Sequence, residues 1–104
     1  MKVYLITDGC GLYKIGRSSD TGLRLKGLQT SNGRELELLY EVDCVHAPKV
    51  EAIMHRRHVS KRVKGEWFEL NQEDRERFVM EVKAIDDNLC YVEQNSTLEN
   101  PLGR

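Results

Sequence analysis

Two side chains with complementary chemistry, Glu51 and His55, lie four residues apart in a segment with a helical pattern. Residues at this spacing share one face of a helix. Glu51 is the only acidic residue between Pro48 and Gly65, and its carboxylate is the hard oxygen ligand that Mg²⁺ or Mn²⁺ accepts. The imidazole of His55 can exchange protons near neutral pH. The pair therefore predicts a place where a divalent cation is held beside a proton-transfer group.

Three further residues could complete such a site: Tyr4, Lys14 and Arg24. The Arg24 guanidinium can bind two oxygens of one phosphate. Tyr4 is a candidate base or water-positioning group, and because a phenol ordinarily titrates near pH 10, a neighbouring cation such as Lys14 would favour its ionised form. Charge stabilisation, an activated water and a metal ion are what phosphodiester hydrolysis requires. Whether Tyr4 and Lys14 share a sheet face is left open, since the turn between them resets the alternation.

The first half of the chain predicts the elements that hold these groups. Residues 2–7 and 12–17 are expected to form an antiparallel hairpin across the turn at residues 8–11. A short helix should follow from residues 18–20 to about Leu28, with Leu25 and Leu28 facing inward. Residues 35–45 alternate as a third strand with one wet face, and its apolar side chains are expected on the other face: Leu36, Leu38, Tyr40, Val42 and Cys44.

The second half predicts a helix from Pro48 to about Ser60 and a short extended piece at Trp67–Phe68 that anchors the core. Asn71 can cap a third helix, whose apolar face is spaced by four, three and four residues: Phe78, Val82, Ile85 and Leu89. Residues 93–104 are polar and predict a loose, flexible tail. The order β-β-α-β-α-(β)-α predicts one α+β domain over residues 1–92, with a small three-stranded antiparallel sheet flanked by helices.

Composition and cysteine content exclude several classes. The chain has 104 residues, which is one domain's worth, and 32% of them are charged, as in soluble globular proteins. No apolar run is long enough for a transmembrane helix or a signal-peptide core. The three cysteines are odd in number and lie far apart, which argues against a disulfide framework, so we expect a cytoplasmic or nucleoid-associated protein that is not secreted.

A zinc site is disfavoured by spacing. Cys44, His46, His55 and His58 do not follow a standard ligand pattern, and Cys44 and His46 share the strand parity assigned to the core. Gly-rich phosphate loops and Gly-x-Ser-x-Gly elbows are also missing from the sequence.

The overall net charge of −1 conceals separate blocks. Residues 1–34 and 49–64 carry six basic side chains each, with two and one acidic side chains respectively. Residues 35–48 carry four acidic and no basic ones. The two basic blocks could meet and form one anion-binding face, or be scattered solvated charges. Several of their members could position phosphates without reading sequence: Arg17, Lys26, Arg56, Arg57, Lys61 and Arg62.

Four motifs in order carry a family resemblance: Val-Tyr at residues 3–4, Lys-Ile-Gly-Arg at 14–17, Glu-x-x-x-His at 51–55 and Gly-Glu-Trp-Phe at 65–68. Together with Arg24-Leu25, they resemble the GIY-YIG nuclease superfamily, in particular its short branch found in phage proteins and meiotically up-regulated gene products. The resemblance covers about residues 2–70. It implies an α+β nuclease fold and a divalent-metal-dependent endonuclease.

The resemblance implies roles for individual residues. Tyr4 takes the place of the first-motif tyrosine, Lys14 stands where the second motif usually has a tyrosine, and Arg24 takes the place of the helix arginine. Glu51 takes the place of the metal-binding glutamate. The asparagine that many family members carry near the end of the module has no clear counterpart, and Trp67-Phe68 stands in that region.

The resulting expectation is an endonuclease that uses Mg²⁺ or Mn²⁺, acts on DNA rather than RNA, contacts no membrane and is small enough to work as a homodimer. Two alternatives remain open at this point. One is a nucleic-acid-binding module that keeps the fold without cleavage, and the other is a structural interaction protein that uses its acidic C-terminal helix.

Overall fold

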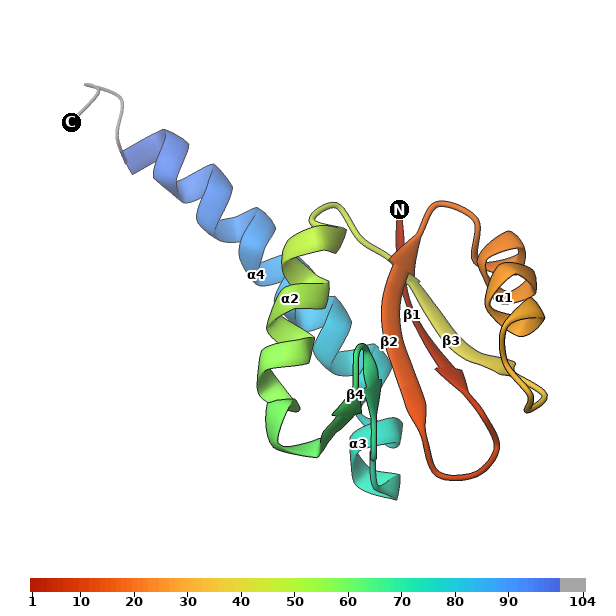
Figure 1. Ribbon diagram of the computed structural model, residues 1–104. Coiled ribbons are helices and arrows are strands. Elements are labelled where there is room, and N and C mark those ends of the chain that lie inside the picture. The colour runs from red at the N-terminus through yellow and green to blue at the C-terminus, as the bar shows by residue number, and fades with distance from the viewer. Residues whose placement is uncertain (100–104) are drawn as a thin grey trace.

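The structure is a computed structural model that describes residues 1–99, with side chains up to Asn95. Its centre is a five-stranded sheet with the strand order β3-β1-β2-β5-β4. Helix α1 covers one face of this sheet, and helices α2 and α4 cover the other (Figure 1). The α+β class is as the sequence predicts, but the expected three-stranded sheet is wrong.

The N-terminal hairpin forms as predicted. Strands β1 (Lys2–Thr7) and β2 (Tyr13–Ser18) pair in antiparallel fashion. Gly9 and Gly11 take φ values of 75° and 101° in the turn between them, a region that favours glycine. Helix α1 (Thr21–Thr30) then begins at Asp20, whose side chain accepts a hydrogen bond from the Leu23 backbone N–H.

Strand β3 (Glu37–Asp43) pairs with β1, but its regular alternation is interrupted. Leu38 lies opposite Ile6 and Tyr40 lies opposite Leu5, so one residue of β3, Leu39, bulges out of the ladder. A bulge shifts the alternation by one residue. The prediction of a single apolar face from Leu36 to Cys44 is therefore wrong, because Leu36 and Leu38 pack on the α1 side while Val42 and Cys44 pack on the α2 side.

Two strands beyond the expected three come from the segment after the second helix. Helix α2 (Ala47–Arg57) has a proline in its first turn, and a short 3-10 turn, η1 (Val59–Lys61), follows it. Strands β4 (Arg62–Lys64) and β5 (Trp67–Phe68) then form a hairpin whose turn contains Gly65 at φ 54°. Strand β5 adds to the free edge of β2. Strand β5 is the extended piece predicted at Trp67–Phe68, whereas β4 was not predicted, because a strand this short carries no periodic signal of its own.

The third predicted helix is present as two. Helix α3 (Gln72–Glu76) begins with the predicted Asn71 cap, which forms a capping box with Asp74. The long helix α4 (Phe78–Glu99) follows and projects beyond the sheet (Figure 1). The segment expected to be a loose tail is therefore helical over residues 93–99, and residues 100–104 lie outside the described residues.

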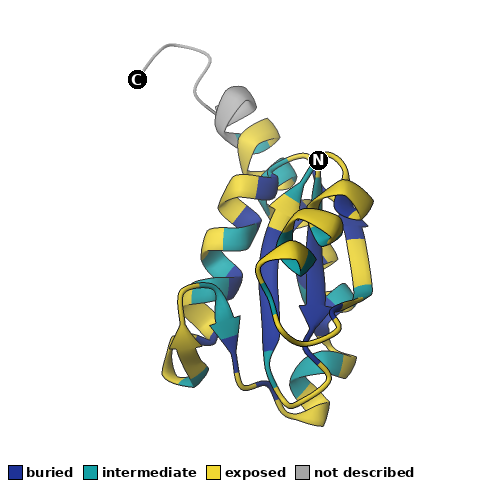
Figure 2. Ribbon diagram, turned by 45° about the vertical axis from the view of Figure 1, so that its right-hand side comes forward, coloured by how far each residue is buried: buried dark blue, intermediate teal, exposed yellow. Residues whose placement is uncertain are grey.

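Two apolar clusters fill the layers on either side of the sheet. Figure 2 shows that burial is concentrated in the central strands, with the outer faces of the helices exposed. On the α2 side, Val50 and Met54 pack with Phe78 and Val82 of α4. On the α1 side, the smaller cluster consists of Tyr4, Ile6 and Leu36, covered by Leu25, Leu28, Leu38 and Trp67. Leu25 and Leu28 thus face inward as predicted.

Among the helices that the structure describes, none combines the length and the apolar character that a membrane crossing requires.

Candidate active site

The candidate site lies at the edge of strand β2, where its partner β5 ends. Strand β5 pairs only with Tyr13 and Lys14, and the last bond across this edge is from the Ile15 backbone N–H to the Glu66 carbonyl at 3.2 Å. Beyond Ile15 the edge of β2 has no neighbouring strand among residues 1–99. Side chains from α1, α2 and the β4–β5 turn can therefore converge there.

Glu51, His55 and Glu66 form a cluster at this edge. One ligand atom from each lies within 4.8 Å of the other two, and all three side chains are half-buried. No other group of three such side chains occurs among the described residues. The His55 Nε2 atom lies 2.7 Å from the Ile15 carbonyl oxygen, which can only accept, so Nε2 carries the proton. This bond orients the ring and leaves the lone pair on Nδ1, an arrangement typical of metal-binding histidines.

Each carboxylate of the cluster is balanced by a cation from β2. Arg17 Nε lies 3.2 Å from Glu51 Oε1, and Lys14 Nζ lies 2.7 Å from Glu66 Oε1. Lys14 is nearly buried, so its ammonium depends on this partner for stability. The two carboxylates are donors that hard cations such as Mg²⁺ or Mn²⁺ accept, and the imidazole is a donor more typical of transition metals. A bound cation would compete with Lys14 and Arg17 for the same oxygens.

The strand register settles whether Tyr4 and Lys14 share a face. Tyr4 lies opposite Gly16 and Ile6 lies opposite Lys14, so the two side chains are diagonal neighbours on the α1 face. The Tyr4 ring lies across Gly16, where a Cβ atom would be 2.5 Å from Tyr4 Cζ. Gly16 thus allows the Tyr4 ring to lie directly on the main chain of β2, which a residue with a side chain would prevent.

The Tyr4 hydroxyl is buried and has no hydrogen-bond partner within the part of the chain that the structure describes. Burial raises the pKa of the Tyr4 phenol above its ordinary value, the Arg24 guanidinium opposes this rise, and the charges of Glu66 and Glu51 add to it. The structure therefore assigns to Arg24 the role that we expected of Lys14, which is engaged by Glu66 instead. A buried hydroxyl without a partner is uncommon, and an ordered water or a catalytic role commonly accounts for one.

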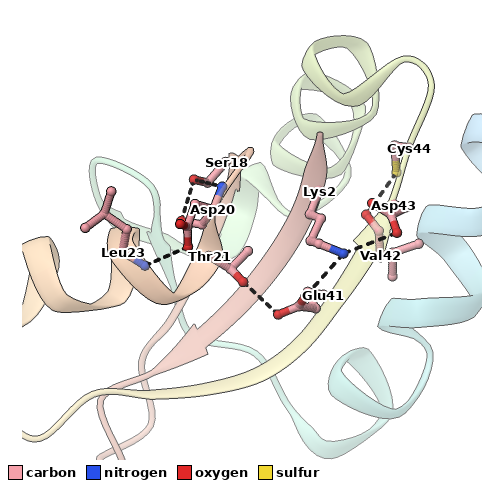
Figure 3. A network of polar contacts seen from close by, with 9 residues as sticks. All are labelled: Lys2, Ser18, Asp20, Thr21, Leu23, Glu41, Val42, Asp43 and Cys44. Atoms are coloured by element: carbon pink, nitrogen blue, oxygen red, sulfur yellow. Dashed lines mark hydrogen bonds and ion pairs between the residues drawn. The ribbon is translucent and has the colours of Figure 1, made fainter.

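Helix α1 carries Arg24 and is fixed by polar contacts at its first turn (Figure 3). The Ser18 hydroxyl bonds to the Asp20 backbone N–H at 3.0 Å. Thr21 Oγ1 donates to Glu41 Oε2 of β3 at 2.7 Å, and Lys2 bridges Glu41 and Asp43. Because Glu41 lies opposite Tyr4 in the β1–β3 ladder, this network ties the start of α1 to the strand that carries Tyr4.

The six residues expected to position phosphates fall into two groups. Three take acidic partners: Arg17 binds Glu51, Arg57 binds Glu81 at 3.5 Å, and Lys61 binds Asp74. The other three are exposed and have no acidic partner among the described residues: Lys26, Arg56 and Arg62. Helices α1 and α2 lie on opposite faces of the sheet, so Lys26 and Arg56 do not share one helical surface, whereas Lys14 and Arg34 line one groove with Lys64.

A comparison with protein families identifies the chain. A model of the T5orf172 domain matches residues 1–87. The chain belongs to the T5orf172 domain family. No curated protein and no solved structure shows significant similarity to it.

The matched residues include every described helix and strand of the chain except the part of α4 that follows residue 87. Within this domain, sequence reasoning placed Glu51 and His55 correctly beside each other, but it assigned no role to Glu66. The available signal was the Gly-Glu-Trp-Phe motif itself, in which the acidic residue directly follows a turn glycine. Within the described part of the chain, Cys44, His46 and His58 belong to no such cluster of three.

Proposed function

We propose that this T5orf172 domain is a GIY-YIG-type endonuclease that hydrolyses phosphodiester bonds of DNA with Mg²⁺ or Mn²⁺. The observation that carries the proposal is the convergence of Glu51, His55 and Glu66 at the open edge of β2, beside the unpartnered hydroxyl of Tyr4. Nuclease-like character fits the T5orf172 family assignment. The family assignment does not itself specify the cleavage activity, the metal or DNA as the substrate, and these three are our proposals.

The division of labour follows from the chemistry of each side chain. Glu51 would hold the metal, with His55 Nδ1 and Glu66 as further donors. A bound divalent cation would supply Lewis-acid stabilisation of phosphate charge. Arg24 would bind the scissile phosphate and favour the ionised form of Tyr4. The Tyr4 oxygen would orient the attacking water and, in its ionised phenolate form, accept the proton of that water.

We propose nucleic acid as the substrate class because its phosphodiester backbone is a polyanion, which cations near the site can hold close to these groups. Lys26, Arg56 and Arg62 are exposed cations on elements that flank the site. Contacts of this kind fix the position of a phosphate backbone without reading its sequence.

The alternative function is a binding module that holds nucleic acid without cutting it. The two ion pairs favour this reading, because Arg17 and Lys14 already neutralise the carboxylates that a metal would need. A single experiment separates the two functions.

Purified protein is incubated with supercoiled plasmid and with single-stranded DNA in Mg²⁺ or Mn²⁺, and cleavage is followed by gel. Glu51→Gln is compared with Glu37→Gln, an exposed strand residue outside the cluster. We expect cleavage by the wild type and by Glu37→Gln, and loss of cleavage with intact DNA binding in Glu51→Gln. Binding without cleavage by the wild type in either metal would support the binding module and reject the nuclease.

A further inference from the structure

A groove of about 620 Å³ opens directly beside the candidate site. Lys14 and Glu66 belong to its wall, so it is continuous with the cluster at the edge of β2. The β4–β5 hairpin contributes Val63, Lys64 and Trp67, and the loop after α1 contributes Asn32 and Arg34. The volume lies within the range of about 300–1,000 Å³ that is typical of small-ligand sites.

We propose that this groove binds one unpaired nucleotide next to the scissile phosphate, with its base stacked on Trp67. The inference rests on the proposed function and narrows its substrate to single-stranded or locally unpaired nucleic acid. A base inside an intact duplex has both faces covered by its neighbours, so it must leave the stack to enter a groove of this kind.

Trp67 is the stacking surface. It packs against the inner cluster of Tyr4, Ile6 and Leu36, yet it is only half-buried and lines the groove. It also lies opposite Lys14 in the β2–β5 ladder, which places the indole next to the candidate site. A ring fixed by packing and accessible to the groove loses little entropy when a base stacks on it. The exposed Val63 adds an apolar contact from strand β4.

The polar groups of the groove match a nucleotide. Lys64 is exposed and has no acidic partner among the described residues, so it can bind a phosphate. Arg34 lies 3.9 Å from Asp8, which is itself held by the backbone N–H groups of Cys10 and Leu12.

Asn32 supplies hydrogen-bonding capacity for a base edge. Its side-chain oxygen accepts from the Arg34 backbone N–H at 3.0 Å, which leaves its amide N–H₂ as a donor. With Asp8 as an acceptor, the groove offers both kinds of partner that the edge of a base needs.

Trp67 is the only tryptophan of the chain, so fluorescence excited at wavelengths where the four tyrosines do not absorb reports on the surroundings of Trp67. The Glu51→Gln protein is titrated with an eight-nucleotide oligothymidylate, the matching oligouridylate, a blunt DNA duplex and inorganic phosphate. We expect saturable quenching by the single strands and little by the duplex or by phosphate.

Substitutions at Lys64 and Trp67 test whether the oligonucleotide binds in the groove. The affinity of each variant is measured from the fluorescence anisotropy of a labelled oligothymidylate. Lys64→Gln should weaken binding severalfold more than Lys49→Gln, an exposed control on α2. Trp67→Leu should weaken it by about 5- to 100-fold, the value of one base–aromatic stack, and Trp67→Phe should restore most of the loss. If Trp67→Leu does not fold, the quenching of the Trp67 fluorescence and the comparison of Lys64→Gln with its control still decide whether a single strand binds in the groove.

The results separate this inference from the proposed function. Cleavage by the wild type, combined with no quenching or with equal quenching by duplex and single strand, would reject nucleotide binding in the groove. The proposed nuclease activity would be unaffected. Selective quenching without any cleavage would support the groove and reject the nuclease. Quenching by phosphate as strong as that by oligothymidylate would reduce the groove to a simple anion site and overturn the inference.

Discussion

The ring of Tyr4 lies across the main chain of Gly16, its partner in the β1–β2 ladder. The missing side chain at Gly16 is what lets the phenol reach the edge of β2. From the α1 face of the sheet, its oxygen then lies close enough to Glu51 and Glu66 for both carboxylates to influence its pKa. The absence of a side chain at Gly16 therefore lets the phenol of Tyr4, on the α1 face, approach Glu51 of helix α2, which covers the opposite face.

Gly16→Ala should destabilise the domain by about 1–3 kcal/mol, because the new methyl group must displace the buried Tyr4 ring. The matched control is Gly27→Ala in α1, where a Cβ atom meets nothing within 4 Å. The control should be stabilising by about 0.5–1 kcal/mol because alanine is the better helix former. Urea unfolding followed by circular dichroism measures both. Equal stability of the two variants would contradict the packing of Tyr4 on Gly16.

Tyr4→Phe should lower the cleavage rate by about 10²- to 10⁴-fold while DNA binding stays unchanged. The ring still packs, and only a buried hydroxyl without a partner is lost. For the same reason the free energy of unfolding should stay level or rise. Single-turnover cleavage and thermal unfolding test the two parts. A variant that cleaves at the wild-type rate would remove Tyr4 from the mechanism.

Arg24→Met should move the rising limb of the cleavage pH profile to higher pH, because Arg24 is the cation that lowers the pKa of the buried Tyr4 phenol. The rate at any one pH should also fall, since a phosphate contact is lost. Lys26→Met, at an exposed position on the same helix, serves as control and should keep the wild-type limb. Rates measured from neutral pH to about pH 11, so that the profile extends beyond the ordinary phenol pKa of about 10, would separate the shift from a uniform loss of rate, and an unmoved limb in Arg24→Met would argue against the coupling.

Glu66→Gln should raise the Mg²⁺ concentration needed for half-maximal cleavage by about tenfold or more, because it weakens one donor of the cluster and releases Lys14. Glu69→Gln, an exposed neighbour on the chain, should leave this concentration unchanged. A metal titration of the cleavage rate decides. Should both variants follow the wild-type curve, Glu66 plays no part in binding the metal.

Asp74 should make folding stability depend on pH. Its partial burial works against ionisation, but the Lys61 ammonium and the Asn71 backbone N–H outweigh it and hold the pKa of Asp74 below its ordinary value. The stabilisation is therefore complete above the unfolded pKa of about 3.9 and is lost as the pH falls through the lower folded value.

Asp74→Asn should accordingly be less stable than the wild type at pH 7, and the difference should shrink below about pH 4. Asp87→Asn, on the exposed face of α4, is the control and should match the wild type throughout. Chemical unfolding at a series of pH values provides the comparison. A stability difference that persists unchanged into acid would show that the Asp74 carboxylate charge is not the cause.

Much of this domain was determined by local sequence. The β-branched and aromatic residues of segment 2–7, the turn glycines and the Asp20 and Asn71 caps each act within a few residues, so the first hairpin, α1 and the start of α3 could be predicted. The helical spacing of Glu51 and His55 likewise placed two members of the cluster on one face.

Contacts between distant segments were decided only by the tertiary structure. The bulge at Leu39 changes which face each side chain of β3 occupies, and the addition of β5 to β2 brings Glu66 to Lys14 across 52 positions of the chain. Lys14 consequently binds Glu66, and Arg24 becomes the cation that acts on Tyr4. Periodicity encodes the direction of a side chain within one element, whereas strand pairing and charge partners depend on how the elements pack together.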